Sequence, residues 1–153
     1  MLEPSCLVHG TTIAVDGRAA LIIGPSGAGK SDLALRCIMT LFHDAGRPLT
    51  ASLVADDQTL VTRRGQRLEV RAPDTIAGRI EVRGLGIVAM PASELAELRL
   101  VADVSPGQQV PRLPDPLEWH ELLGLRVPLV RLRSWEAGAP ARLVLALLRL
   151  GGS

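Results

Sequence analysis

Eight consecutive residues have the types and the spacing of a phosphate-binding loop. They are Gly24, Pro25, Ser26, Gly27, Ala28, Gly29, Lys30 and Ser31, and they match G-x-x-x-x-G-K-[ST] at every fixed position. Glycines let successive backbone N–H groups turn inward onto phosphate oxygens. The lysine supplies an ammonium for the β- and γ-phosphates, and the serine hydroxyl supplies a ligand for Mg²⁺. The loop therefore predicts a site for a nucleoside triphosphate with Mg²⁺.

Lys30 is the only lysine of the chain, although the chain has 17 basic residues. All the others are arginine, whose guanidinium is broad and planar, whereas the ammonium of lysine is a compact point charge. A lysine kept at this one position indicates that the position needs a charge small enough to fit between two phosphates.

Two adjacent acids, Asp56 and Asp57, follow the apolar run Ala51–Ala55. A carboxylate at the end of a buried strand is typical of the second half of a phosphate-loop metal site. One acid of the pair can hold Mg²⁺ or its water, and the other can accept the proton of an attacking hydroxyl. The sequence leaves open which of them is the base, and an acidic turn without catalytic function is the alternative.

Glu81 and Arg83 stand two residues apart, just before Gly84 and Gly86. If both lie on one strand, their side chains share a face and can carry a metal ligand and a phosphate clamp. A surface ion pair that enters a turn is the alternative by spacing alone. His9 precedes the first expected strand, and a histidine so placed is more often structural or solvated than catalytic.

The phosphate loop needs a strand before it and a helix after it, and the sequence predicts both. Ala19–Ile23 is an apolar run typical of a buried strand, and residues 32–41 have helical spacing. Thr11–Val15 is expected to form a hairpin with the strand that leads into the loop, with Asp16 and Gly17 as its turn.

Further along, the chain alternates short apolar runs with turn signals. Expected strands are 59–62, 67–71, 80–83, 87–89, 98–104 and 127–132, with a proline-rich surface loop at 106–116 and a helix at 139–150. The hairpins argue against a purely parallel sheet. We therefore predict an α/β fold, a phosphate-loop kinase domain with a mixed sheet, formed as a single domain by residues 1–153.

Composition excludes several classes of protein. A net charge of +1, three aromatic residues and no tyrosine argue against a nucleic-acid partner. No apolar run approaches the ~20 residues that a membrane-spanning helix requires, so no membrane partner is expected. Cys6 and Cys37 are the only cysteines and form no C-x-x-C pair. They indicate a reduced, cytoplasmic setting without a metal cluster, with Cys37 in the core.

Together these motifs resemble one family, the bacterial HPr kinase/phosphorylase, in its C-terminal catalytic domain. The resemblance runs from about Val8 to Val104. It comprises His9-Gly10, the phosphate loop, the sequence LVADD at 53–57 and the sequence IEVRGLGI at 80–87. The phosphate loop is generic, but its combination with the other two segments is specific to the family.

The resemblance implies a fold similar to that of phosphoenolpyruvate carboxykinase, and a kinase that uses ATP and Mg²⁺. Its partner would be HPr, the phosphocarrier protein of the sugar phosphotransferase system, phosphorylated on a serine. Lys30 would bind phosphate, and Ser31 and Glu81 would face Mg²⁺. Asp57 would accept the proton in the kinase direction, and His9 would be an accessory residue of the active site.

The chain departs from the family at three places. The family's additional N-terminal domain is not in this sequence, which resembles a short form. Leu122 stands where the family has an arginine before a Leu-Gly pair. The segment 131–136 replaces the family's late Pro-Gly-Arg-Asn loop, which is tied to dephosphorylation. Phosphorolysis of seryl-phosphorylated HPr therefore stays open, and so does the homo-oligomer that the resemblance suggests.

Two other functions remain compatible with the residues. One is a small-molecule kinase on a similar scaffold. The other is a nucleotide-sensing regulatory module that binds ATP without transferring phosphate. The leading hypothesis is the protein-serine kinase, in which Lys30 and Arg83 offset charge on the transferring phosphoryl group and Asp57 takes the proton.

Overall fold

The computed structural model describes residues 3–152, which form two α-helices, one 3₁₀-helix and thirteen strands. The first strands are β1 (Ser5–His9), β2 (Thr11–Val15), β3 (Arg18–Ile23), β4 (Phe42–Asp44), β5 (Arg47–Leu49) and β6 (Ser52–Ala55). The later strands are β7 (Gln58–Arg64), β8 (Arg67–Arg71), β9 (Arg79–Val82), β10 (Gly86–Ala89), β11 (Ala96–Asp103), β12 (Glu118–Leu122) and β13 (Leu125–Arg131). The helices are α1 (Lys30–Ile38), the 3₁₀-helix η1 (Asp74–Ile76) and α2 (Ala139–Leu150).

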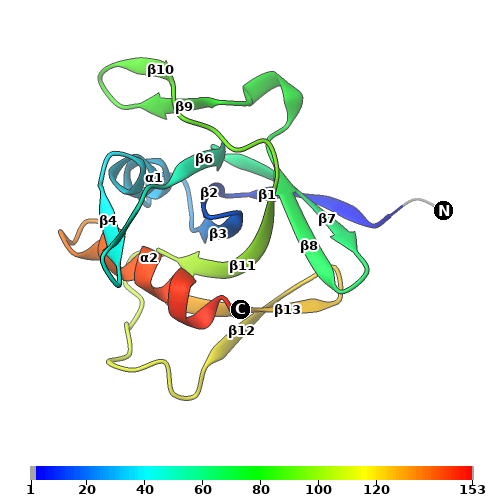
Figure 1. The fold of residues 1–153 in the computed structure, drawn as a ribbon, viewed down its shortest axis with the longest axis vertical. Coiled ribbons are helices and arrows are strands. Elements are labelled where there is room, and N and C mark those ends of the chain that lie inside the picture. The colour runs from blue at the N-terminus through cyan, green and yellow to red at the C-terminus, as the bar shows by residue number, and fades with distance from the viewer. Residues whose placement is uncertain (1–2, 153) are drawn as a thin grey trace.

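Nine of these strands form one curled sheet (Figure 1). Its order is β1-β7-β8-β11-β3-β2-β6, and β13 pairs with β11 and carries β12 at its outer side. β11 runs parallel to β3 and β13, whereas the other pairs are antiparallel. The predicted mixed sheet of an α/β domain is confirmed.

The β2–β3 hairpin forms where the sequence predicts it. Asp16 and Gly17 have φ angles of 52° and 75°, so both central residues of the turn are left-handed, as a type I′ turn requires. Thr12 pairs with Leu21 and Ile13 with Ala20 in the register. This hairpin places the end of β3 at the centre of the sheet, directly before the phosphate loop.

Both α-helices pack on one face of the sheet. Leu33 and Cys37 of α1, Leu143 of α2 and Ile22 of β3 belong to the same buried cluster. Burial raises the pKa of the Cys37 thiol to about 12, in keeping with a cysteine that packs rather than reacts. A second buried cluster, which includes Val61, Val70 and Leu98, fills the other face beneath the curl of β1, β7 and β8.

The structure differs from the sequence prediction in the helix after the loop and in four strands. α1 ends at Ile38, three residues before the predicted end, and the Thr40 hydroxyl turns back to bond the Arg36 carbonyl. β1, β4, β5 and β12 were not predicted. β4 and β5 have only three residues each, and β1 and β12 lack a run of buried residues.

β9 and β10 form a hairpin that stands apart from the main sheet at the top of Figure 1. The segment between β11 and β12 contains no helix or strand, as predicted for 106–116. Within residues 3–152, no helix is long and apolar enough to cross a membrane.

Candidate active site

The phosphate loop lies between β3 and α1, as predicted. Gly24, Gly27 and Gly29 have φ angles of 154°, 82° and 90°, conformations that residues with a Cβ rarely adopt. Gly29 is the N-cap of α1, which begins at Lys30. The free N–H groups of the first helical turn therefore open directly onto the loop, and they favour an anion there.

Lys30 is only 7% exposed, although it carries the one lysine ammonium of the chain. Its Nζ donates to the Gly24 carbonyl at 2.8 Å and to the Pro25 carbonyl at 3.0 Å. The side chain thus folds back across the loop with its charge on the inner side. Phosphate oxygens would replace the carbonyls as acceptors for the same ammonium.

Asp56 is buried and links three parts of the site. Its Oδ1 accepts hydrogen bonds from the Ser31 hydroxyl at 2.5 Å and from the Thr11 hydroxyl at 3.1 Å. Its Oδ2 accepts the backbone N–H of Glu81 at 3.0 Å. A carboxylate held by three donors is fixed in position, and it orients the serine hydroxyl that the motif assigns to Mg²⁺.

Asp57 differs from Asp56 in backbone conformation and in exposure. Its φ of 67° turns the chain sharply, so its side chain leaves the sheet edge and is 71% exposed. The Asp57 backbone N–H donates to the Thr11 hydroxyl at 3.2 Å, and its carbonyl accepts from Gly10 N at 2.9 Å. Its backbone is therefore anchored while its carboxylate is accessible from solvent.

His9 lies at the end of β1, and its Nε2 is 3.1 Å from Oδ1 of Asp57. Gly10 makes this approach feasible, because a Cβ at that position would lie 2.8 Å from the Ile22 carbonyl oxygen. The sheet thus brings His9 next to Asp57. The family resemblance implied a place near the active site for His9, whereas its position in the sequence alone did not.

Glu81 and Arg83 are placed differently from the expectation based on strand spacing. β9 ends at Val82, so Arg83 begins the turn to β10 and does not share a strand face with Glu81. In the described part of the chain, no hydrogen bond or ion pair joins the Arg83 side chain to another residue. The Glu81 side chain is exposed, and it is the backbone of this residue that contacts Asp56.

The donors present fit Mg²⁺ better than a transition metal. The site offers a buried carboxylate, a hydroxyl and an exposed carboxylate from Asp56, Ser31 and Glu81, all hard oxygen ligands. Among residues 3–152, no group of three or more His, Cys, Asp or Glu side chains could hold a metal ion by itself.

Thr11 is a residue of the site that was not predicted from the sequence. Its hydroxyl donates to Asp56 and accepts from the backbone of Asp57, so it holds both acids. Thr11 and Thr12 are fully buried. Two threonines at the start of a predicted buried strand indicate hydrogen-bond partners nearby, because buried polar groups are almost always hydrogen-bonded.

The strand–loop–helix unit, with two acids at the end of β6 on the other side of β2, defines the chain as a phosphate-loop domain on a mixed sheet. A family model described as the HPr Serine kinase C-terminal domain matches residues 1–145. The chain belongs to this family.

Curated relatives agree with the family model. The HPr kinase/phosphorylase of Chlorobium limicola is 34% identical over 141 residues, covering 81% of this chain and 38% of the relative. That of Azoarcus sp. (strain BH72) is 39% identical over 137 residues, covering 82% of this chain and 41% of the relative. The chain thus spans about two fifths of the length of these relatives.

A solved structure, that of the Hpr(Ser) kinase/phosphatase from Coxiella burnetii, matches the fold. Its TM-score is 0.71 and its identity is 25%, with 94% of each chain covered. The predicted resemblance to this family, and the fold that it implied, are therefore confirmed.

Replacing Asp56 by asparagine is expected to weaken the response to Mg²⁺. Asparagine has one acceptor oxygen in place of two, so its NH₂ group must face either the Glu81 N–H or the Ser31 hydroxyl, and the side chain is no longer held by all its donors. Loss of an outer partner of a metal ligand alone typically costs about 10- to 100-fold in metal affinity or activity, and we expect at least that loss for Asp56. Turnover measured against Mg²⁺ concentration checks this, with Asp16→Asn, an exposed turn residue, as control. Equal Mg²⁺ dependence in both variants contradicts the role.

Proposed function

We propose that this chain is a protein-serine kinase that transfers the γ-phosphoryl group of ATP to a serine of HPr or an HPr-type phosphocarrier. The single observation that carries the proposal is the division between the two acids. Asp56 is buried and holds Ser31, whereas Asp57 is exposed beside His9. A site that only bound nucleotide would have no use for an exposed carboxylate beside a histidine at the phosphate end.

The residues of the chain supply positioning and charge. The loop N–H groups and the Lys30 ammonium bind the phosphate tail and neutralise charge on the transferring group. Asp56, Ser31 and Glu81 would hold Mg²⁺, whose charge supports the β- and γ-phosphate oxygens. Arg83, exposed in the turn of the β9–β10 hairpin, would reach the transferring group from the acceptor side.

The acceptor's proton goes to Asp57. As the serine oxygen forms its bond to the γ-phosphorus, the bond from phosphorus to ADP breaks, and the hydroxyl proton moves to an Asp57 oxygen. His9, at 3.1 Å, orients that carboxylate. In the opposite direction, Asp57 would return the proton to the serine oxygen while phosphate or ADP accepts the phosphoryl group.

The kinase direction is the part of the activity that the residues support best. Leu122 is the last residue of β12 and offers no charge where the family has an arginine, and segment 131–136 replaces the family's late loop. The chain therefore lacks one arginine and one loop that the family is expected to use in phosphorolysis. We further propose that the chain acts as one catalytic domain in the cytoplasm, within a homo-oligomer.

Intact-mass analysis of HPr after incubation with this protein and MgATP tests the proposal. We expect one phosphate on a serine residue of HPr, and a second incubation with inorganic phosphate reports on phosphorolysis through pyrophosphate release. In a parallel incubation with labelled ATP, label on a metabolite and none on HPr would indicate a small-molecule kinase. Tight ATP binding without transfer to any acceptor would indicate a nucleotide-sensing module, and either outcome rejects the proposal.

A further inference from the structure

The segment that follows β13 packs behind the phosphate loop, although it lies more than 100 residues further along the chain. Ser134 is only 5% exposed, and its hydroxyl donates to the Ala28 carbonyl at 2.6 Å. Nothing in the family motifs assigns a role to this serine, because it lies in the segment that departs from the family. It is nonetheless the side chain that binds the loop backbone from behind.

The contact is tight enough to dictate a glycine in the loop. A Cβ at Gly29 would lie 2.7 Å from the Ser134 Oγ and 3.2 Å from its Cβ. Gly29 also has a φ of 90°, so both its backbone conformation and its neighbour exclude a side chain. The loop and the Ser134 segment are thus fitted to each other.

The helix after the loop holds the same segment. Arg36 of α1 donates through Nη2 to the Ser134 carbonyl and through Nη1 to the Glu136 carbonyl at 3.2 Å. Its Nε binds Asp32 one turn earlier on α1 at 3.0 Å. One guanidinium therefore ties the Ser134 segment to the helix whose N-terminus forms the phosphate site.

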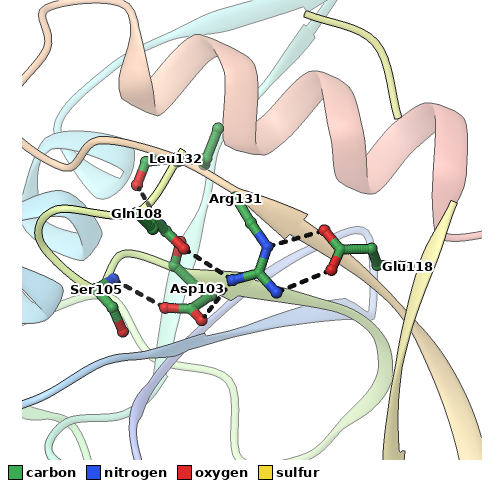
Figure 2. Close-up of polar contacts among 6 residues, drawn as sticks. All are labelled: Asp103, Ser105, Gln108, Glu118, Arg131 and Leu132. Atoms are coloured by element: carbon green, nitrogen blue, oxygen red, sulfur yellow. Dashed lines mark hydrogen bonds and ion pairs between the residues drawn. The ribbon is translucent and has the colours of Figure 1, made fainter. Parts of the chain in front are cut away.

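Arg131, directly before the Ser134 segment, is also held in place. Figure 2 shows Arg131, the last residue of β13, between the carboxylates of Glu118 and Asp103. Arg131 pairs with Glu118 through two hydrogen bonds of 2.8 Å and with Asp103 at 3.2 Å. Hydrogen bonding from Arg131 lowers the pKa of Glu118, in keeping with the ion pair. Asp103 is aligned with Ile23, the last residue before the loop.

The direction of the Ala28 carbonyl decides what the loop offers to a phosphate. In a planar trans peptide, the carbonyl oxygen and the next N–H point in opposite directions. With the Ala28 carbonyl held toward Ser134, the N–H of Gly29 in the same peptide points away from Ser134. If the peptide turned over, the loop would present a carbonyl oxygen to the phosphate in place of a donor.

We infer that Ser134 is a positioning residue, which holds the Ala28–Gly29 peptide in the orientation that nucleotide binding requires. This inference rests on the proposed nucleotide-dependent function and adds a residue to it. Ser134 acts through the loop backbone and takes no part in the transfer itself. Its loss should therefore change affinity for the nucleotide and leave the rate at saturation unchanged.

Titration of Ser134→Ala with a non-hydrolysable ATP analogue and Mg²⁺ tests the inference. We expect the Kd and the KM for ATP to rise about 3- to 10-fold, the usual range for one lost hydrogen bond, with kcat unchanged. The matched control is Ser52→Ala, which removes a part-buried hydroxyl that pairs with Ser93 at the far end of β6. Ser52→Ala should bind the analogue as the wild type does.

An unchanged Kd in Ser134→Ala overturns the inference, and so does an equal rise in Ser52→Ala. If Ser134→Ala does not fold, Arg36→Lys provides the test. Lysine keeps the charge but cannot donate to the Ser134 and Glu136 carbonyls at the same time. A raised Kd supports the inference and a wild-type Kd overturns it. If the wild type phosphorylates HPr and Ser134→Ala has the wild-type Kd for the analogue, the inference alone is rejected. If the wild type binds no nucleotide, the proposed function is rejected together with the inference.

Discussion

Lys30→Ala is expected to abolish measurable phosphoryl transfer to HPr. The ammonium is the one lysine charge of the chain, and it is held inside the loop by the Gly24 and Pro25 carbonyls. Removing one preorganised donor that faces developing charge usually costs about 10²- to 10³-fold in kcat. Weaker binding of the triphosphate adds to that loss. Steady-state phosphorylation of HPr against ATP concentration measures both effects.

Lys30→Arg separates charge from shape. The position is almost fully buried, and a guanidinium is too broad to replace an ammonium held between two neighbouring carbonyls. We therefore expect this variant to be nearly as inactive as the alanine variant. Arg47→Ala, which removes an exposed cation that pairs with Asp16, is the control and should retain wild-type activity. Full activity in Lys30→Arg would reject the requirement for a compact charge.

Asp57→Asn should bind nucleotide normally and lose turnover. Asparagine keeps the size of the side chain and tolerates the left-handed φ of 67°, so the fold is preserved. It cannot accept the serine proton, and loss of a general base typically costs about 10²- to 10⁴-fold. The Kd for an ATP analogue and the rate of HPr phosphorylation, measured on the same preparation, give the two readouts.

The contrast with Asp56→Asn assigns the two acids. The buried Asp56 should govern the dependence on Mg²⁺, and the exposed Asp57 should govern the rate at saturating Mg²⁺ and ATP. If Asp57→Asn transferred phosphate at the wild-type rate, the base would have to be another group, and the geometry around His9 would have no catalytic meaning.

The sequence predicted those parts of the candidate site whose residues are close together along the chain. The phosphate loop is contiguous, and its strand and helix flank it, so its pattern alone placed Lys30 and Ser31. The acids were found because they end a buried strand. Their different roles could not be read, since these depend on the φ of Asp57 and on which hydroxyls the sheet brings to Asp56.

Contacts between distant segments were beyond the sequence pattern. Nothing in residues 131–136 indicates that Ser134 reaches Ala28, because that contact requires the parallel pairing of β11 with both β3 and β13. Arg83 was misplaced for a related reason. Alternation along a strand predicts a shared face only while the strand lasts, and β9 ends one residue before it.

A crystal structure of this chain with a non-hydrolysable ATP analogue and Mg²⁺ tests the account most directly. The account predicts that the Lys30 ammonium leaves the Gly24 and Pro25 carbonyls for oxygens of the β- and γ-phosphates. The metal should lie beside Ser31 and Asp56, with the γ-phosphate facing Asp57. A triphosphate bound elsewhere, or a γ-phosphate that Asp57 cannot approach, would contradict it.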